Sequence, residues 1–212
     1  MRRILFCNIA WMDKYQGITP NDKPVNGGSY VEHTKNAHEA SNFLPRHFTV
    51  DDESSEYCLG FFETKSTNGN ARNQLHIEKI DSGINKTIES IDNVLVIWCA
   101  KCPSNDFTSV VGWYKNATVY RYYQEVEIGS ESIQAYNILA KAEYCVLLPT
   151  NIRSRRTMWW VPRVAKRNGP SYGFGQANVW FANEKDNKGK ENYLNKIIGL
   201  IDNYDGENYM IL

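Results

Sequence analysis

The residues best suited to chemistry lie in one segment rich in cations and aromatic rings, residues 144–183. These forty residues contain no Asp or Glu, whereas the rest of the chain carries 18 basic against 24 acidic residues. Arg and Lys neutralise phosphates and aromatic rings stack on bases, so the segment predicts an anionic partner, with nucleic acid as the first candidate. A solvated basic loop followed by a core strand is the alternative. The predicted phosphate-binding residues of this segment are Arg153, Arg155, Arg156, Arg163, Lys166 and Arg167.

Several aromatic residues fall near predicted strand ends and loops, where they could form a cage around a planar base. Burial in the core is the competing interpretation for each of them, because Trp at a strand end is commonly a core residue. The predicted base-pocket residues are Trp11, Tyr30, Trp113, Tyr114, Trp159 and Trp160.

A second pattern contains the residue types of a metal-dependent nuclease. Asp51 or Asp52 precedes Glu63-Thr-Lys65, the order found in PD-(D/E)xK nucleases, where two carboxylates hold a divalent metal and the Lys stabilises charge. The pattern is short and matches many proteins of this size by chance. The alternative function is therefore a nuclease using Asp52, Glu63 and Lys65; otherwise Glu63 and Lys65 share an outward strand face.

The cysteines form a third pattern. Trp98-Cys-Ala-Lys-Cys-Pro103 follows an apolar run and has the spacing of a thioredoxin-type redox site. The helix that would lower the pKa of the first thiol is not predicted, and a zinc site lacks two further ligands at suitable spacing. Five cysteines is an odd number, and four lie in strand-like runs. Reduced, buried thiols in a cytoplasmic protein are the expectation.

The remaining polar motifs predict no cofactor and no metal. The four His residues do not form an HExxH motif, there is no G-x-S-x-G elbow, and Gly169–Gln176 lacks the Gly-Lys-Ser/Thr of a phosphate-binding loop. No apolar run reaches the roughly 18 residues of a membrane span, so no membrane partner is expected.

Most of the elements that we expect around these residues are strands. The 57–65 and 73–80 strands are expected to pair, and a turn near Lys115–Asn116 is expected to join two others. Apolar and β-branched runs predict strands at 3–10, 57–65, 73–80, 93–100, 108–116, 117–128, within 136–149 and at 176–183.

Few helices accompany these strands. A short helix is predicted over 36–43, capped by Asn36, and an amphipathic helix over 189–204. Strands and helices do not alternate regularly, which argues against a doubly wound parallel sheet. The expected fold class is α+β: a curved mixed or antiparallel sheet, or a small β-barrel, with peripheral helices. One domain over 1–212 is preferred to a division near 85–92.

Four blocks of the sequence carry a family resemblance. The blocks are Cys7–Gly17 with Gly27–Val31, Val94–Trp98 with Val110–Arg121, Val146–Pro149, and Gly173–Trp180. They resemble uncharacterised bacterial domains found beside HNH-type nucleases. The order of strand, VVGWY strand and basic loop is also similar to the PUA-like modules of the EVE, YTH and ASCH type.

This resemblance implies a binding module rather than an enzyme. PUA-like modules hold a flipped or single-stranded base in an aromatic pocket, and in modification-dependent restriction they recognise a modified base and recruit a nuclease. It implies Trp113, Tyr114 and Trp11 at the pocket, and Lys115 and Asn116 near the phosphates. The expected partners are duplex DNA carrying a modified base and a nuclease on another chain or domain. A protein-interaction domain is the second alternative.

Overall fold

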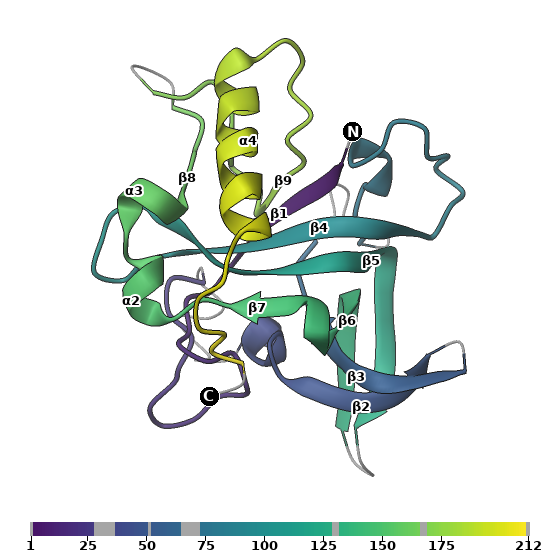
Figure 1. Cartoon of the computed structure of the whole chain (residues 1–212). Coiled ribbons are helices and arrows are strands. Elements are labelled where there is room, and N and C mark those ends of the chain that lie inside the picture. Colours follow the sequence, from purple (N-terminus) through teal and green to yellow (C-terminus); the bar gives the residue numbers. More distant parts are fainter. Residues whose placement is uncertain are drawn as a thin grey trace.

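The computed structural model describes residues 2–27, 37–50, 52–64, 73–128, 132–165 and 169–210, and these form a curved mixed sheet with helices at its periphery (Figure 1). The predicted α+β class with a curved sheet is thereby confirmed. The strands are β1 (Arg3–Ile9), β2 (Pro45–Val50), β3 (Glu53–Gly60), β4 (Ser90–Lys101), β5 (Thr108–Ile128), β6 (Ser132–Lys141), β7 (Cys145–Leu147), β8 (Trp160–Val161) and β9 (Val179–Trp180). The helices are α2 (Thr150–Arg153), α3 (Arg156–Trp159) and α4 (Lys188–Asp202), and the 3-10 turns are η1 (His38–Ser41), η2 (Ile77–Lys79) and η3 (Ala142–Tyr144).

The sheet has the order β2-β3-β6-β5-β4-β1-β9, and β5 connects its two halves. One edge of β5 pairs with β4, and the other edge pairs in turn with β6, β7 and β8. Only β1 and β4 pair in parallel among the named strands. The register of β5 shifts between Val119 and Gln124, where the strand turns from one half of the sheet to the other (Figure 1).

The predicted turn at Lys115–Asn116 is wrong, because β5 runs through it without interruption. Lys115 and Asn116 together face the single residue Leu95, so they form a β-bulge. Asn116 has a φ of 53°, a left-handed conformation that Asn tolerates better than most residues. Asn116 therefore does mark a departure from regular strand geometry, but this departure is a β-bulge within one strand rather than a turn between two strands.

The continuous apolar runs of β1, β4 and β5 arise because both faces of the central sheet are covered. In β4, Val94, Val96 and Trp98 point into core cluster 1, whereas Leu95 and Ile97 point into core cluster 2 on the opposite face. Core cluster 1 is closed by loops, η1 and η2; core cluster 2 is closed by α3, α4 and the segment around β9.

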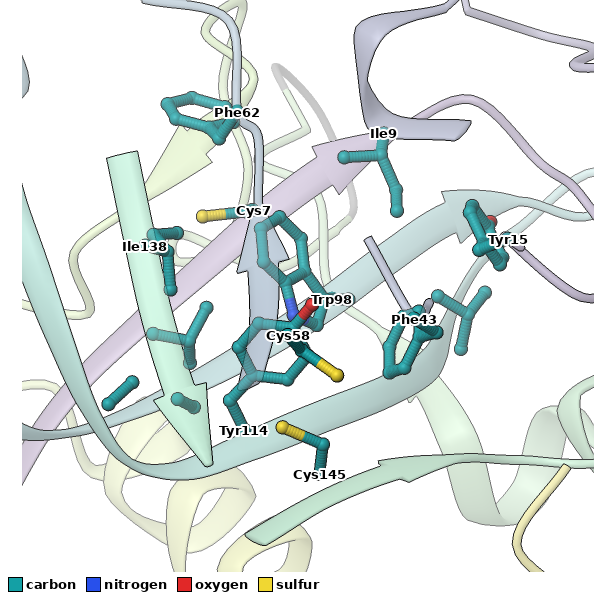
Figure 2. Close-up of a cluster of buried hydrophobic side chains, with 14 of the residues drawn as sticks. Cys7, Ile9, Tyr15, Phe43, Cys58, Phe62, Trp98, Tyr114, Ile138 and Cys145 are labelled. Carbon is teal, nitrogen blue, oxygen red and sulfur yellow. The ribbon is translucent and has the colours of Figure 1, made fainter. Parts of the chain in front are cut away.

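Core cluster 1 contains aromatic rings and thiols packed together (Figure 2). Trp98 and Tyr114 meet edge to face with ring centroids 5.3 Å apart, and Phe43 packs on Tyr114 at 5.4 Å. Cys58 and Cys145 lie beside these rings and are fully buried. Aromatic pairs of this geometry contribute about 0.5–1.5 kcal/mol each beyond their burial.

Helix α4 confirms the amphipathic prediction for 189–204. Tyr193, Ile197 and Ile201 recur every four residues and are buried against core cluster 2. The Asn187 side chain accepts a hydrogen bond from the amide of Lys190 and so caps the first turn. Figure 1 shows the helix lying over β1, β4 and β9.

Other elements also differ from the sequence-based predictions. Residues 73–80 are not a strand: they contain the three-residue turn η2, and β3 pairs instead with β2 and β6. The β2 strand was not predicted, because Pro45 and its polar neighbours obscure the alternation. The 36–43 helix is the short turn η1, which begins after Ala37. Its predicted cap, Asn36, lies outside the described residues.

Candidate functional site

The structure does not bring the predicted base-pocket aromatics together on a surface. Trp113 and Trp159 are each 1% exposed and stack within core cluster 2, with ring centroids 5.7 Å apart and an interplanar angle of 20°. Trp11 and Tyr114 lie in core cluster 1, on the opposite face of the sheet. Trp160 is half-buried and packs against core cluster 2.

The burial of Trp113 and Tyr114 has a simple cause, since β5 is covered on both faces at this point. The hydroxyl of Tyr114 donates to the carbonyl of Asn42, and burial raises the pKa of Tyr114 well above its ordinary value. The expectation that Trp11, Trp113 and Tyr114 offer open faces to a base is therefore corrected: these side chains are core residues. Four further predicted residues lie outside the described part of the chain: Tyr30, Lys65, Lys166 and Arg167.

Arg153 is a structural residue rather than a phosphate contact. Its side chain is fully buried, and its guanidinium donates to the carbonyls of Leu148, Met12 and Asp13, the last two at 2.7 and 2.6 Å. The guanidinium carbon also lies 5.5 Å from the centre of the Trp11 ring. Arg153 thus joins the loop after β1 to the chain entering α2.

Three predicted cations remain at the surface. Arg155, Arg156 and Arg163 are exposed, and none is paired with a carboxylate within the part of the chain that the structure describes. Lys115 is half-buried and lies 3.3 Å from Asp202, while Asn116 is exposed in the bulge. Among the predicted phosphate contacts that the structure describes, Arg155, Arg156 and Arg163 are therefore the most available to an anionic partner.

Beside α3 lies a cavity of about 320 Å³, here called cavity 1. It is bounded by α2 and α3 on one side and by the C-terminal end of α4 on the other. Its lining includes Trp159, which was predicted as a base-pocket residue, and Arg155, which was predicted as a phosphate contact. Apolar side chains form most of its wall: Pro149, Ile152, Met158, Trp159, Leu200 and Tyr204.

Polar groups in cavity 1 lie mainly on the segment that follows α4. Tyr204 is half-buried, its hydroxyl donates to the carbonyl of Glu207, and its pKa is raised by burial and by the charges of Glu207 and Asp205. Asn203 and Asn151 add amide groups to the wall. The indole NH of Trp159 is buried and has no hydrogen-bond partner among the described residues.

The residues after α4 line cavity 1 but were not predicted as site residues. Asn203, Tyr204 and Asp205 follow the amphipathic helix in a run of polar residues and Tyr, a composition that also suits an ordinary chain end. The residue types therefore suited a binding site, but no regular spacing distinguished them from an ordinary surface loop. Tertiary packing of α4 against α3 is what brings these residues to Arg155.

The residues of the nuclease alternative are not brought together. Asp52 lies in the turn between β2 and β3, and Glu63 follows the opposite end of β3. Eight strand residues separate the two ends, a distance of roughly 26 Å at the usual rise per residue. No group of three His, Cys, Asp or Glu side chains within the described ranges could hold a metal ion. Asp52 and Glu63 therefore cannot share one.

The cysteine prediction is confirmed for all five thiols, which are free and buried. Burial raises the pKa of Cys99 well above its usual value, opposite to the lowering that a reactive redox thiol needs. Cys102 follows the end of β4, and the chain continues through turns into β5 rather than into a helix. The Cys99-x-x-Cys102 spacing is thus a feature of the core.

No family model, curated protein or solved structure matches the chain. The described helices include none with the length and apolar character needed to cross a membrane. The function must therefore be inferred from cavity 1, the exposed arginines and the remaining surface.

Proposed function

We propose that the protein is a DNA-binding module that holds one base in cavity 1 and contacts the adjoining phosphates with Arg155 and Arg156. The observation that carries this proposal is that Arg155 and Trp159 border the same small cavity beside α3. The proposal retains the nucleic-acid partner expected from the sequence and moves the base pocket from Trp11, Trp113 and Tyr114 to the space between α3 and the end of α4.

The size and the walls of cavity 1 support a single planar ring as its occupant. Its volume of about 320 Å³ lies at the small end of the range for ligand pockets, about 300–1,000 Å³. Met158 and Leu200 give apolar surface to the wall, and Tyr204 contributes a half-buried aromatic ring. Stacking on one such ring is worth about 1–3 kcal/mol, comparable to the cost of unstacking a base.

The distribution of charge supports a definite orientation of the strand. Arg155 lines one side of the cavity, with the exposed Arg156 next to it in the chain, and phosphates would be attracted there. Asp205 and Glu207 line the other side, where phosphates would be repelled. Carboxylates accept hydrogen bonds from exocyclic amino groups such as that of cytosine. The arrangement therefore favours a base with an amino group, entering from the arginine side.

Within this proposal the protein is a PUA-like reader of a modified base that acts in modification-dependent restriction, with cleavage performed by a nuclease on another chain or domain. A modification that weakens pairing or stacking would lower the cost of base flipping and so provide selectivity. The support for this finer statement is the sequence resemblance together with the small cavity beside exposed arginines.

The test is fluorescence-anisotropy binding to matched duplexes that carry cytosine, 5-methylcytosine, 5-hydroxymethylcytosine, adenine or N6-methyladenine, at two salt concentrations. We expect one modified duplex to bind most tightly. We also expect the affinity for every duplex to fall with salt, with a slope of about −0.9 per phosphate contact in a plot of log binding constant against log salt concentration. Equal affinity for all duplexes would leave only non-specific binding.

Two variants test separately what Arg155 and Asp205 contribute to DNA binding. Arg155→Gln should weaken binding to every duplex and reduce the salt slope by about 1, because phosphate contacts carry no sequence information. Asp205→Asn keeps the shape of the side chain and should change the preference among bases while preserving the salt slope. Lys86→Gln, an exposed cation that does not line cavity 1, is the matched control. No binding at either salt would refute the proposal and favour a protein partner.

A further inference from the structure

A second cavity, of about 400 Å³, lies on the opposite face of the sheet from cavity 1 and is here called cavity 2. Cavity 2 is bordered by core cluster 1 residues such as Phe62 and Leu75, whereas cavity 1 is bordered by Trp159 of core cluster 2. Three segments meet there: the chain after β3, the chain through η2, and the chain around β9. No residue is shared between the two cavities.

The first wall of cavity 2 is held by buried polar side chains. Asn137 is 1% exposed, and its amide both accepts from the backbone NH of Phe62 and donates to the Phe62 carbonyl, at 3.0 and 2.9 Å. The hydroxyl of Tyr123 accepts from the NH of Thr64 at 2.8 Å. Glu63 lies between these two anchored residues, so its exposed carboxylate is presented from a fixed backbone.

The second wall contains a histidine whose orientation is set by an ion pair. The ring Nδ1 of His76 lies 2.9 Å from one oxygen of Glu78, and the other oxygen lies 2.7 Å from the guanidinium of Arg121, whose side chain is 2% exposed. Burial raises the pKa of Glu78, but hydrogen bonds from Arg121, from the backbone and from His76 outweigh this effect and lower the pKa to about 2. Glu78 is therefore ionised and accepts from Nδ1–H, which leaves Nε2 of His76 for a ligand.

The third wall supplies aromatic surface and is tied to β1. The carbonyl of Asn178 accepts from the NH of Asn8 at 2.7 Å, and Phe181 follows β9. The ammonium of Lys79, from the η2 side, lies 5.5 Å from the centre of the Phe181 ring. Cavity 2 therefore combines Phe62 and Phe181 with two basic groups and one carboxylate.

We propose that cavity 2 is a binding site for a free mononucleotide whose base carries an exocyclic amino group. The base would lie against Phe181 and Phe62, the phosphate would meet Lys79, Nε2 of His76 would accept a hydrogen bond from a ligand hydroxyl, and the amino group would donate to Glu63. This assignment uses each polar group in the role that its charge allows: cations bind phosphate, and a carboxylate accepts from an amine. It does not rest on the DNA-binding proposal, because cavity 1 contributes nothing to it.

The experiment is isothermal titration calorimetry of the full chain with AMP, CMP, GMP, UMP and inorganic phosphate. We expect at least one of AMP, CMP and GMP to bind more tightly than UMP, which lacks an amino group, and we expect phosphate alone to bind more weakly than that nucleotide. Lys79→Gln should weaken the favoured nucleotide by about tenfold, because it removes a charge-assisted contact.

Glu63→Gln gives the sharper result. It should weaken the favoured amino-bearing nucleotide by about tenfold and leave UMP unchanged, since only the former donates to this carboxylate. Glu63 and Lys79 are both exposed, so neither variant should fail to fold; matched thermal unfolding curves check this. Arg155→Gln in cavity 1 is the control and should change nothing. Absence of heat for all four nucleotides at millimolar concentration, or affinities unchanged in both Lys79→Gln and Glu63→Gln, would overturn the proposal.

Discussion

Arg153 and Arg155 lie two residues apart in the same basic segment but have opposite environments. Arg153 is enclosed by Met12, Asp13 and Leu148, whose carbonyls accept its hydrogen bonds, whereas Arg155 is exposed at the rim of cavity 1. A sequence pattern treats the two alike, because composition does not reveal which side chain the fold encloses. The distinction matters for any experiment that removes positive charge from this segment.

The first prediction compares these two arginines. Arg153→Met should lower the free energy of unfolding by about 3 kcal/mol or more, since it leaves buried carbonyls without donors. Arg155→Met should change the free energy of unfolding by less than about 0.5 kcal/mol, as expected for an exposed side chain. Urea unfolding at constant salt measures both. Equal stability of the two variants would show that Arg153 does not support the fold.

The second prediction concerns the pH dependence of the Glu78–Arg121 pair. The pKa of Glu78 is lowered from 4.5 to about 2 in the folded protein. The stabilisation it provides is therefore present above pH 4.5 and is lost as the pH falls from 4.5 towards 2. Glu78→Gln should destabilise the protein at pH 7 by roughly 1–2 kcal/mol, after allowance for solvent screening. The difference from the natural chain should shrink at pH 3; a difference that is the same at pH 7 and pH 3 would contradict the assignment.

At the scale of elements, periodicity predicted what depends on local patterns. The run VLVIWCA of β4 and the four-residue spacing of Tyr193, Ile197 and Ile201 in α4 both match the structure. The failures have tertiary causes. Leu75 and Ile77 alternate like strand residues, but they are buried from a turn that packs on core cluster 1. Local patterns alone could not tell this case from a strand.

The candidate site shows the same limit more strongly. Trp159 and Arg155 were predicted for a base pocket and a phosphate contact, and both border cavity 1. Trp113 was predicted beside them but lies in the core, because its outward-looking face is covered by Trp159 and Tyr204. Aromatic residues in a sequence are equally consistent with a base-binding cage and with a hydrophobic core. Only the packing of α3 and α4 on β5 decides between these two interpretations.

The third prediction tests which face of α4 stabilises the fold. Ile197 is 1% exposed, whereas Ile198 is half-buried at the edge of core cluster 2. Ile197→Ala should cost about 2–4 kcal/mol, and Ile198→Ala clearly less, because the cavity left by Ile197 is enclosed. Both variants replace Ile by Ala, so the change in helix propensity is the same, and the difference in stability between them reflects packing alone. Chemical unfolding of the two variants provides the measurement, and a reversed order would place the buried face elsewhere.

For the whole molecule, core clusters 1 and 2 share the strands β1, β4 and β5, which contribute alternate side chains to each. Neither cluster can be lost while the other keeps its strands in place. The prediction of one domain over 1–212 was made from the sequence and stays a prediction; the division near 85–92 would overlap the start of β4, which begins at Ser90.

The fourth prediction follows from these shared strands. Thermal or urea unfolding should show a single cooperative transition, because both clusters are lost together. Tryptophan fluorescence, which reports on Trp98 in core cluster 1 and on Trp113 and Trp159 in core cluster 2, should coincide with far-ultraviolet circular dichroism. Two transitions at different urea concentrations would indicate separate units and would support the boundary near 85–92.

The pairing of β1 with β9 has a consequence for synthesis on the ribosome. One edge of β1 is covered by β4, but the other is covered by β9, and the adjoining face is closed by α4, which follows β9 in the chain (Figure 1). A nascent chain that ends before Val179 therefore exposes an open strand edge and the apolar side of Phe6 and Ile97. Such edges pair readily with other chains. Chaperone demand and aggregation should thus be greatest for translation products that stop shortly before β9.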